Sequence, residues 1–152
     1  MEKNYYTEEE KYWCSGGNTG TLPSRITPSG VNTLAPGEIF VFGSNFEGKH
    51  FGGAAKAAME KFGAVLGIGE GLQGQSYAIP TMEGLENILP AVERFTSFAR
   101  QHKELKFFVT AIGCGIAGYS AEQIAPMFTD AATLSNVYLP VSFWKTILNT
   151  AE

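Results

Sequence analysis

Glycines gather in three short stretches of this chain, over residues 43–53, 63–74 and 113–118. The first and third stretches each follow an apolar, strand-forming segment directly and lead into a helix-forming one. Glycine allows positive φ angles and lets a ligand approach the backbone closely. The first amides of a helix are unpaired, and the helix dipole favours negative charge beside them. The pattern therefore predicts two backbone sites for an anion such as a phosphate group.

The first stretch combines glycines with polar side chains. Gly52 and Gly53 stand where a helix is expected to begin, and Lys49 and His50 are expected at the loop tip, where they can add charge or hydrogen bonds. The ligand-binding residues predicted here are Gly43, Ser44, Asn45, Gly48, Gly52, Gly53 and Ala54.

The third stretch, like the first, joins a strand-forming segment to a helix-forming one. Its predicted ligand-binding residues are Gly113, Cys114, Gly115, Ile116, Ala117, Gly118 and Tyr119, with Tyr119 as a ring that stacks on a ribose or base. A P-loop is excluded because no glycine is followed by the required Gly-Lys-Ser/Thr. Two such loops at one sheet edge suit a diphosphate held from both sides.

The elements that position these loops alternate between strands and helices. Strands are expected at 38–42, 64–66, 75–79, 106–112 and 136–139, and helices at 27–34, 54–62, 85–103, after Ser120 and at 141–149, with 67–74 as a loop. This alternation predicts an α/β fold with a mainly parallel sheet and helices on both faces. In such sheets ligands bind beyond the carboxyl ends of the strands.

Length and composition limit the classes of protein. A chain of 152 residues favours one domain, here 25–152, preceded by an arm over 1–24. A net charge of −4 without a basic run makes nucleic acid an unlikely partner, and no membrane segment or signal peptide is expected. Cys14 and Cys114 form no disulfide framework or zinc motif. We expect a cytoplasmic protein with no metal and no cofactor.

Three motifs in order resemble the macro domain family. Val41 to Asn45, the glycines to 53 and Ala54-Ala55 are similar to the family's Val-Asn-Ala-Ala-Asn strand end, glycine loop and alanine-containing helix. Ser76 to Pro80 is similar to its Gly-Tyr-x-Leu-Pro strand. The stretch 113–119 matches its Gly-Thr-Gly-Ile-Phe-Gly-Tyr loop with two changes. Together they cover roughly residues 38–130.

The resemblance implies a three-layer α/β/α fold that binds ADP-ribose or a related NAD-derived nucleotide. It implies that both loops clasp the diphosphate and that Asn45 contacts the far ribose. The family's hydrolytic members often carry an aspartate after the first glycine run, where this chain has Gly53-Ala54-Ala55-Lys56. The family's Gly-Asp-Ile-Thr segment, which recognises adenine, has no clear counterpart before residue 38.

Three functions remain open on the sequence. The first is a binding module for ADP-ribose or a similar nucleotide. The second is an ADP-ribosyl hydrolase acting on ADP-ribosylated protein or a small product, with Asn45 and His50 as candidate catalytic residues and Glu47, Glu70 or Glu83 as the base. The third is a protein-interaction domain that docks through residues 5–13. Cys114 is either a nucleophile or a small residue in the family's threonine position.

Overall fold

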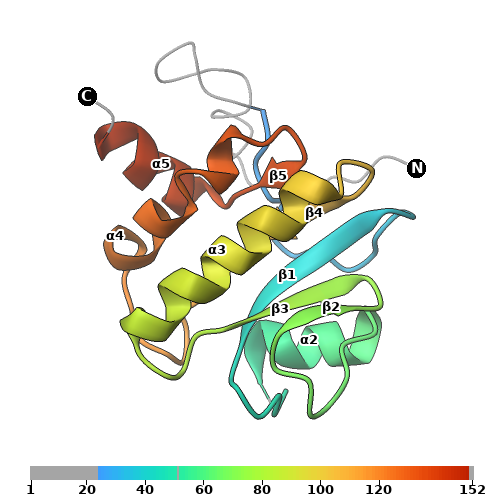
Figure 1. The fold of residues 1–152 in the computed structure, drawn as a ribbon. Helices are drawn as coiled ribbons and strands as arrows, with labels where there is room; N and C mark the ends of the chain where they lie inside the picture. The colour runs from blue at the N-terminus through green and yellow to red at the C-terminus, as the bar shows by residue number, and fades with distance from the viewer. Residues whose placement is uncertain (1–23, 51, 151–152) are drawn as a thin grey trace.

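A computed structural model describes residues 24–50 and 52–150 of the chain (Figure 1). Its five strands form one sheet in the order β2-β3-β1-β4-β5. The strands are β1 (Glu38–Ser44), β2 (Gly71–Gln73), β3 (Ser76–Pro80), β4 (Lys106–Val109) and β5 (Val137–Tyr138). The helices are α2 (Gly53–Lys61), α3 (Leu85–Gln101), α4 (Ala121–Ile124) and α5 (Val141–Thr150), with 3₁₀ turns at Ala125–Phe128 and Ala131–Thr133.

Strand β1 is central because both of its faces are apolar. It pairs in parallel with β3 on one side and β4 on the other, and β4 pairs in parallel with β5. Side chains alternate along a strand, so Ile39 and Val41 face one core while Phe40 and Phe42 face the other. Only β2 runs antiparallel, against β3. The expected α/β class with a mixed, mainly parallel sheet is thereby confirmed.

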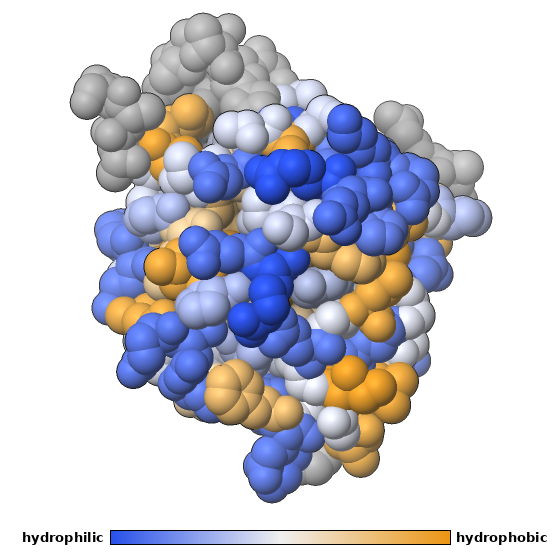
Figure 2. All heavy atoms as spheres, in the orientation of Figure 1, coloured by the Kyte–Doolittle hydropathy of each residue, from blue (hydrophilic) through white to orange (hydrophobic). Residues whose placement is uncertain are grey.

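The helices cover the sheet unequally. The apolar stripe of α3, including Val92 and Phe95, packs with α5 and the segment 121–134 into the larger core. Helix α2 packs through Ala55 and Ala58 against the smaller core on the opposite face (Figure 1). The face carrying α3 is mostly hydrophilic, with apolar groups concentrated toward its lower right (Figure 2). No described helix has both the length and the apolar character needed to cross a membrane.

Three local expectations are wrong. No helix forms over 27–34, because Thr27 N–H donates to Leu139 O (2.9 Å) and Ile26 bridges Leu139, which draws this segment along the sheet. The expected strand at 64–66 is absent, and the presumed loop 67–74 contains β2. A turn at Gly74 and Gln75, with Gly74 at φ +61°, folds β2 back onto β3. All three errors concern segments whose partners are distant in sequence or lie across a hairpin. The predicted arm, apart from Ser24, lies outside the described residues.

Candidate functional site

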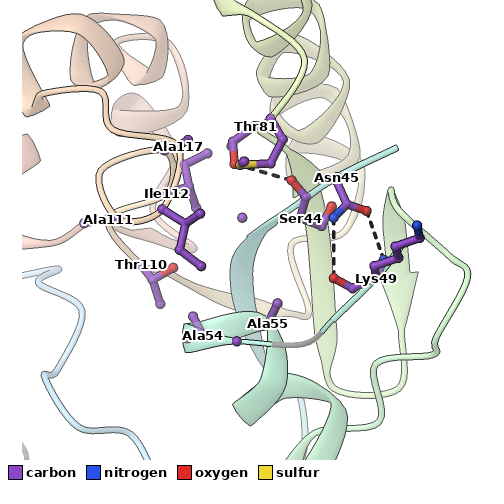
Figure 3. A pocket seen from close by; sticks show the side chains of 17 residues that line it. Ser44, Asn45, Lys49, Ala54, Ala55, Thr81, Thr110, Ala111, Ile112 and Ala117 are labelled. Atoms are coloured by element: carbon purple, nitrogen blue, oxygen red, sulfur yellow. Dashed lines mark hydrogen bonds between the residues drawn. The ribbon is translucent and has the colours of Figure 1, made fainter. Parts of the chain in front are cut away.

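A cavity of about 430 Å³ opens at the carboxyl ends of β1 and β4, between the first and third glycine loops. In Figure 3, Ser44, Asn45 and Lys49 lie on one side, Ile112 and Ala117 on the other, and Ala54 and Ala55 along the base. The predicted residues that line it are Gly43, Ser44, Asn45, Gly52, Gly53, Ala54, Gly113, Gly115, Ile116 and Ala117. The two loops are therefore brought to a single cavity.

The start of α2 presents free backbone donors to this cavity. The first amide with an acceptor is that of Lys56, which donates to Gly52 O (3.2 Å). Among the described residues, the N–H groups of Gly53, Ala54 and Ala55 find no acceptor. All three residues line the cavity. Their amides form the anion-favouring end of the helix.

The third glycine loop presents a second set of free donors. Its turns are closed by Cys114 N–H donating to Ala111 O (3.2 Å), Gly118 N–H to Gly115 O (3.0 Å) and Tyr119 N–H to Gly113 O (2.8 Å). Within the described part of the chain, the amides of Gly115, Ile116 and Ala117 have no acceptor. These three residues also line the cavity.

The two loops face each other at close range. A Cβ placed on Gly52 would lie 3.7 Å from Cδ1 of Ile116, the side chain of which is 82% exposed. A ligand between the loops is therefore within reach of donors from both, with Ile116 over the entrance.

Asn45 holds the first loop as well as lining the cavity. Its Oδ1 accepts from Lys49 N–H (2.9 Å) and its Nδ2 donates to Lys49 O (3.4 Å). Gly48 N–H donates to Asn45 O (3.0 Å). An amide side chain has two N–H groups and two lone pairs, so one of each is left for a ligand.

The first loop is locked onto the chain segment 65–69. Ser44 Oγ donates to Gly69 O, and Gly67 N–H donates to Gly48 O (2.9 Å). Gly48 has φ +68°, and any side chain there would overlap the backbone of Ile68. Glycine at 48 thus has a close-packing role and does not line the cavity.

Buried Gln73 organises that same segment. Its Oε1 accepts from Val65 N–H (2.7 Å), and its Nε2 donates to Ile68 O (3.0 Å) and Gly71 O (3.4 Å). We refer to the contacts of residues 44, 48 and 50 with 65–69, together with these bonds of Gln73, as the loop clamp.

His50 belongs to the loop clamp, so the expected loop-tip position is wrong. Its side chain is 0% exposed and lies edge-on to Phe42, with ring centroids 5.2 Å apart. Its Nε2 lies 3.0 Å from Val65 O, and its Nδ1 has no partner among the described residues. The imidazole packs in the protein and does not line the cavity.

Three other predicted residues, Cys114, Gly118 and Tyr119, also lie outside the cavity lining. Cys114 and Tyr119 pack against the larger core. Burial raises the pKa of the Cys114 thiol, and the nearby Glu122 carboxylate raises it further. A raised pKa disfavours the thiolate, which is the nucleophilic form.

Each of the three candidate carboxylates has a partner in the protein, although Oε1 of Glu83 is buried and has none among the described residues. Glu47 pairs with Lys49 Nζ (3.2 Å), Glu70 binds Arg94 through both oxygens (2.6 and 2.8 Å), and Glu83 accepts from Phe46 N–H (2.9 Å). None of them lines the cavity. Lys49 is the one charged residue among the described residues that line the cavity. Over residues 24–50 and 52–150, no three His, Cys, Asp or Glu side chains gather as a metal site.

The sequence prediction missed several lining residues, including Thr81, Met82 and Thr110. They follow β3 and β4 directly, so the rule that ligands bind beyond strand carboxyl ends was the available signal. The Thr110 hydroxyl donates to Val41 O (2.8 Å), and that of Thr81 donates to Ser44 O (3.4 Å). Both therefore brace β1 beside the cavity.

In comparisons with known proteins, no family model, no curated protein and no solved structure matches the chain.

Proposed function

We propose that this protein binds ADP-ribose or a related NAD-derived nucleotide diphosphate in the cavity between its two glycine loops. The proposal includes a three-layer α/β/α arrangement of the macro type and an ADP-ribosylated protein as a carrier of the ligand. The observation that carries it is that residues 53–55 and 115–117, the amides of which have no acceptor among the described residues, line one cavity.

A diphosphate matches this arrangement because it is an anion with acceptor oxygens on two phosphorus atoms. One phosphate takes the amides at the start of α2, and the other takes those of the third loop. Backbone donors of this kind bind phosphate without net positive charge on the protein. Lys49, whose pair with Glu47 is largely exposed, can turn toward the ligand at little cost.

The cavity also supports the remainder of a nucleotide. Its volume lies within the range typical of small-molecule sites, about 300–1,000 Å³. Its walls carry small and apolar residues, including Ala54, Ala55 and Ile112, which accept the flat faces of sugars and rings. Asn45 retains hydrogen-bonding capacity for a hydroxyl group.

Binding is favoured over hydrolysis by the side chains present. A hydrolase needs a group that activates water, and the described lining of this cavity has no carboxylate. His50, one of the two candidate catalytic residues, is enclosed by the loop clamp. We therefore rank the binding module above the ADP-ribosyl hydrolase.

Isothermal titration calorimetry with ADP-ribose and with pyrophosphate tests the proposal. The variant is Gly52→Val, because Gly52 has extended backbone (φ −155°, ψ 165°) that valine favours and its Cβ would meet only Ile116. We expect wild type to bind both compounds and Gly52→Val to lose at least about tenfold in affinity, since the new side chain occupies the gap between the loops.

Ala35→Val is the matched control, since it adds bulk at an exposed site before β1, at the opposite end of the strand from the cavity. It should bind like wild type, and circular dichroism should show both variants folded. Full affinity in folded Gly52→Val would reject the assigned loops. Failure of wild type to bind either compound would reject nucleotide binding and leave the protein-interaction alternative.

A further inference from the structure

Large apolar side chains are exposed around the outer strand β2. One belongs to β2 itself, three to the segment that precedes it and one to the first glycine loop. A Cβ placed on Gly69 would meet Phe46 O, so the segment and the loop are in contact. The apolar groups toward the lower right of Figure 2 lie over the part of the fold where Figure 1 places β2. We refer to these side chains as the edge patch: Phe46, Val65, Leu66, Ile68 and Leu72.

The two edges of the sheet differ in what covers them. At the β5 edge the segment 25–27 runs alongside, since Leu139 N–H donates to Arg25 O (3.3 Å) and Thr27 N–H donates to Leu139 O (2.9 Å). At the β2 edge, no strand of the described chain pairs with the outer side. β2 also contains no lysine or proline, which commonly protect an exposed edge. The open edge of the sheet therefore coincides with the edge patch.

The carboxylates beside the edge patch are already paired within the chain. Glu47 follows Phe46 and pairs with Lys49 Nζ (3.2 Å). Glu70 precedes β2 and binds Arg94 through both oxygens (2.6 and 2.8 Å). These positions thus carry no excess charge that would attract a charged partner, such as an acidic peptide or an anionic membrane surface. They also set no unpaired like charges against each other when two copies of the patch meet.

The size of the edge patch suits a contact between two proteins. Its members are 43–55% exposed, which for five large residues amounts to on the order of 400 Å². A standard interface buries about 800 Å² of each partner, of which about 56–58% is apolar. The patch therefore supplies most of the apolar surface that one side needs. Because β2 has three residues and few backbone groups to offer, the partner must bring an apolar surface of its own.

We propose that the edge patch is the contact surface of a homodimer, in which β2 of two copies pairs antiparallel about a two-fold axis. A two-fold contact sets identical surfaces against each other, so each patch covers the other. Antiparallel pairing gives partners to the outer backbone groups of both strands. Because the segment 25–27 covers the other edge of each sheet, the assembly closes at two copies. The inference concerns assembly and is independent of the nucleotide.

Sedimentation equilibrium of the full chain tests the dimer. We expect wild type to have about twice the mass of one chain at micromolar concentrations. Leu72→Lys should weaken association at least about tenfold, because it sets two ammonium groups against each other across the axis. Leu89→Lys is the matched control, since Leu89 is 42% exposed, against 45% for Leu72, and lies on α3 outside the edge patch. It should associate like wild type.

Three results would overturn the inference. The first is a wild type that stays monomeric at about 100 µM, which would leave the edge patch to a different protein. The second is full association in Leu72→Lys. The third is equal weakening by Leu72→Lys and Leu89→Lys when circular dichroism shows both folded.

Leu72→Cys in a Cys14→Ser background tests the pairing of β2. Leu72 is the middle residue of β2, so antiparallel pairing about a two-fold axis sets it opposite its own copy. Residues directly opposite in such a pair have Cα atoms about 4.5–5.5 Å apart, a separation that a disulfide spans. Oxidation with copper phenanthroline should therefore link two chains of this variant, whereas Leu89→Cys in the same background should stay unlinked. A dimer in which Leu72→Cys forms no link would overturn the strand pairing.

Discussion

Cys114 lies between two glycines of the third glycine loop, and its surroundings oppose reactivity. Free amides near a thiol favour the thiolate, but here the Cys114 amide donates to Ala111 O and the side chain packs against the larger core. Desolvation of the thiol and the negative charge of Glu122 both favour the neutral form and raise its pKa. The residue thus serves as a small apolar group under the loop.

Alkylation kinetics test this interpretation in a Cys14→Ser background, where Cys114 is the remaining cysteine. We expect iodoacetamide at pH 8 to modify the folded protein at least about tenfold more slowly than the urea-unfolded chain, because less thiolate forms. Since the folded pKa is raised, the neutral thiol contributes stability below the unfolded pKa, and that contribution is lost as pH rises through the folded value. Equal alkylation rates in the folded and unfolded states would contradict the interpretation that Cys114 is an unreactive thiol.

At the scale of elements, the loop clamp makes one rigid unit of two loops. The first loop carries cavity residues, whereas the segment 65–69 carries none. Gln73, at the end of β2, joins the backbone groups of Val65 and Ile68, and His50 contacts Val65 from the other loop. The shape of the cavity thus depends on a glutamine that does not line it.

Gln73→Leu should loosen this unit. It leaves the Val65 N–H and the Ile68 carbonyl without partners, so we expect a loss of about 2 kcal/mol in the free energy of unfolding. Urea denaturation measures this loss. Hydrogen exchange should show reduced protection at the Gly67 amide, which donates to Gly48 O.

Gln75→Leu is the control for this prediction. The Gln75 side chain donates to Ala35 O (2.9 Å) and Glu38 O (3.2 Å), at the end of β1 remote from the cavity. It should cost some stability but leave Gly67 protection unchanged. If both variants expose Gly67 equally, the clamp does not act locally.

Local signals in the sequence were sufficient for several elements. The nearly continuous apolar run of β1 predicted a buried strand, and the apolar stripe of α3 predicted the main helix. The cap of α4 was also predictable, since Ser120 Oγ accepts from Gln123 N–H (3.3 Å) and Gln123 Oε1 accepts from Ser120 N–H (2.9 Å), three residues apart.

Contacts between distant segments escaped prediction. Thr27-Pro28 has the composition of a helix start, but its partner, Leu139, is far along the chain. The burial of His50 depends on Phe42 and Val65, and no spacing rule connects the three. For the same reason the glycine loops were predictable as donors, whereas the cavity that residues 27–31 line together with Pro140 was not predictable.

At the scale of the whole molecule, Arg25 joins the two ends of the described chain. Its guanidinium donates to Ala132 O (2.9 Å), Leu134 O (2.7 Å) and Val137 O (2.6 Å), and lies 5.4 Å from the centre of the Trp144 ring. Trp144 Nε1 donates in turn to Arg25 O (2.7 Å). Partial burial lowers the pKa of Arg25, with no change of charge at ordinary pH.

Arg25→Met should destabilise the protein strongly, because it removes the donors of three carbonyls. We expect the free energy of unfolding to fall by about 3 kcal/mol, measured by urea denaturation. Arg100→Met, at an exposed site on α3, is the control and should change it by less than about 0.5 kcal/mol. Similar losses in both variants would show that Arg25 is no special anchor.

The parallel bridge between Ile26 and Leu139 has a consequence for biogenesis. Arg25 and Val137 are 112 residues apart, so the early segment leaves the ribosome long before its partner is translated. Until then the segment that follows Ile26 lacks its partner, Leu139. The cavity beside Phe40, which this segment lines together with Pro140, is also incomplete. Nascent chains halted before Val137 would thus carry both glycine loops but lack the part of the neighbouring cavity that Pro140 lines. The cavity beside Phe40 is therefore completed only when the last part of the chain has been synthesised.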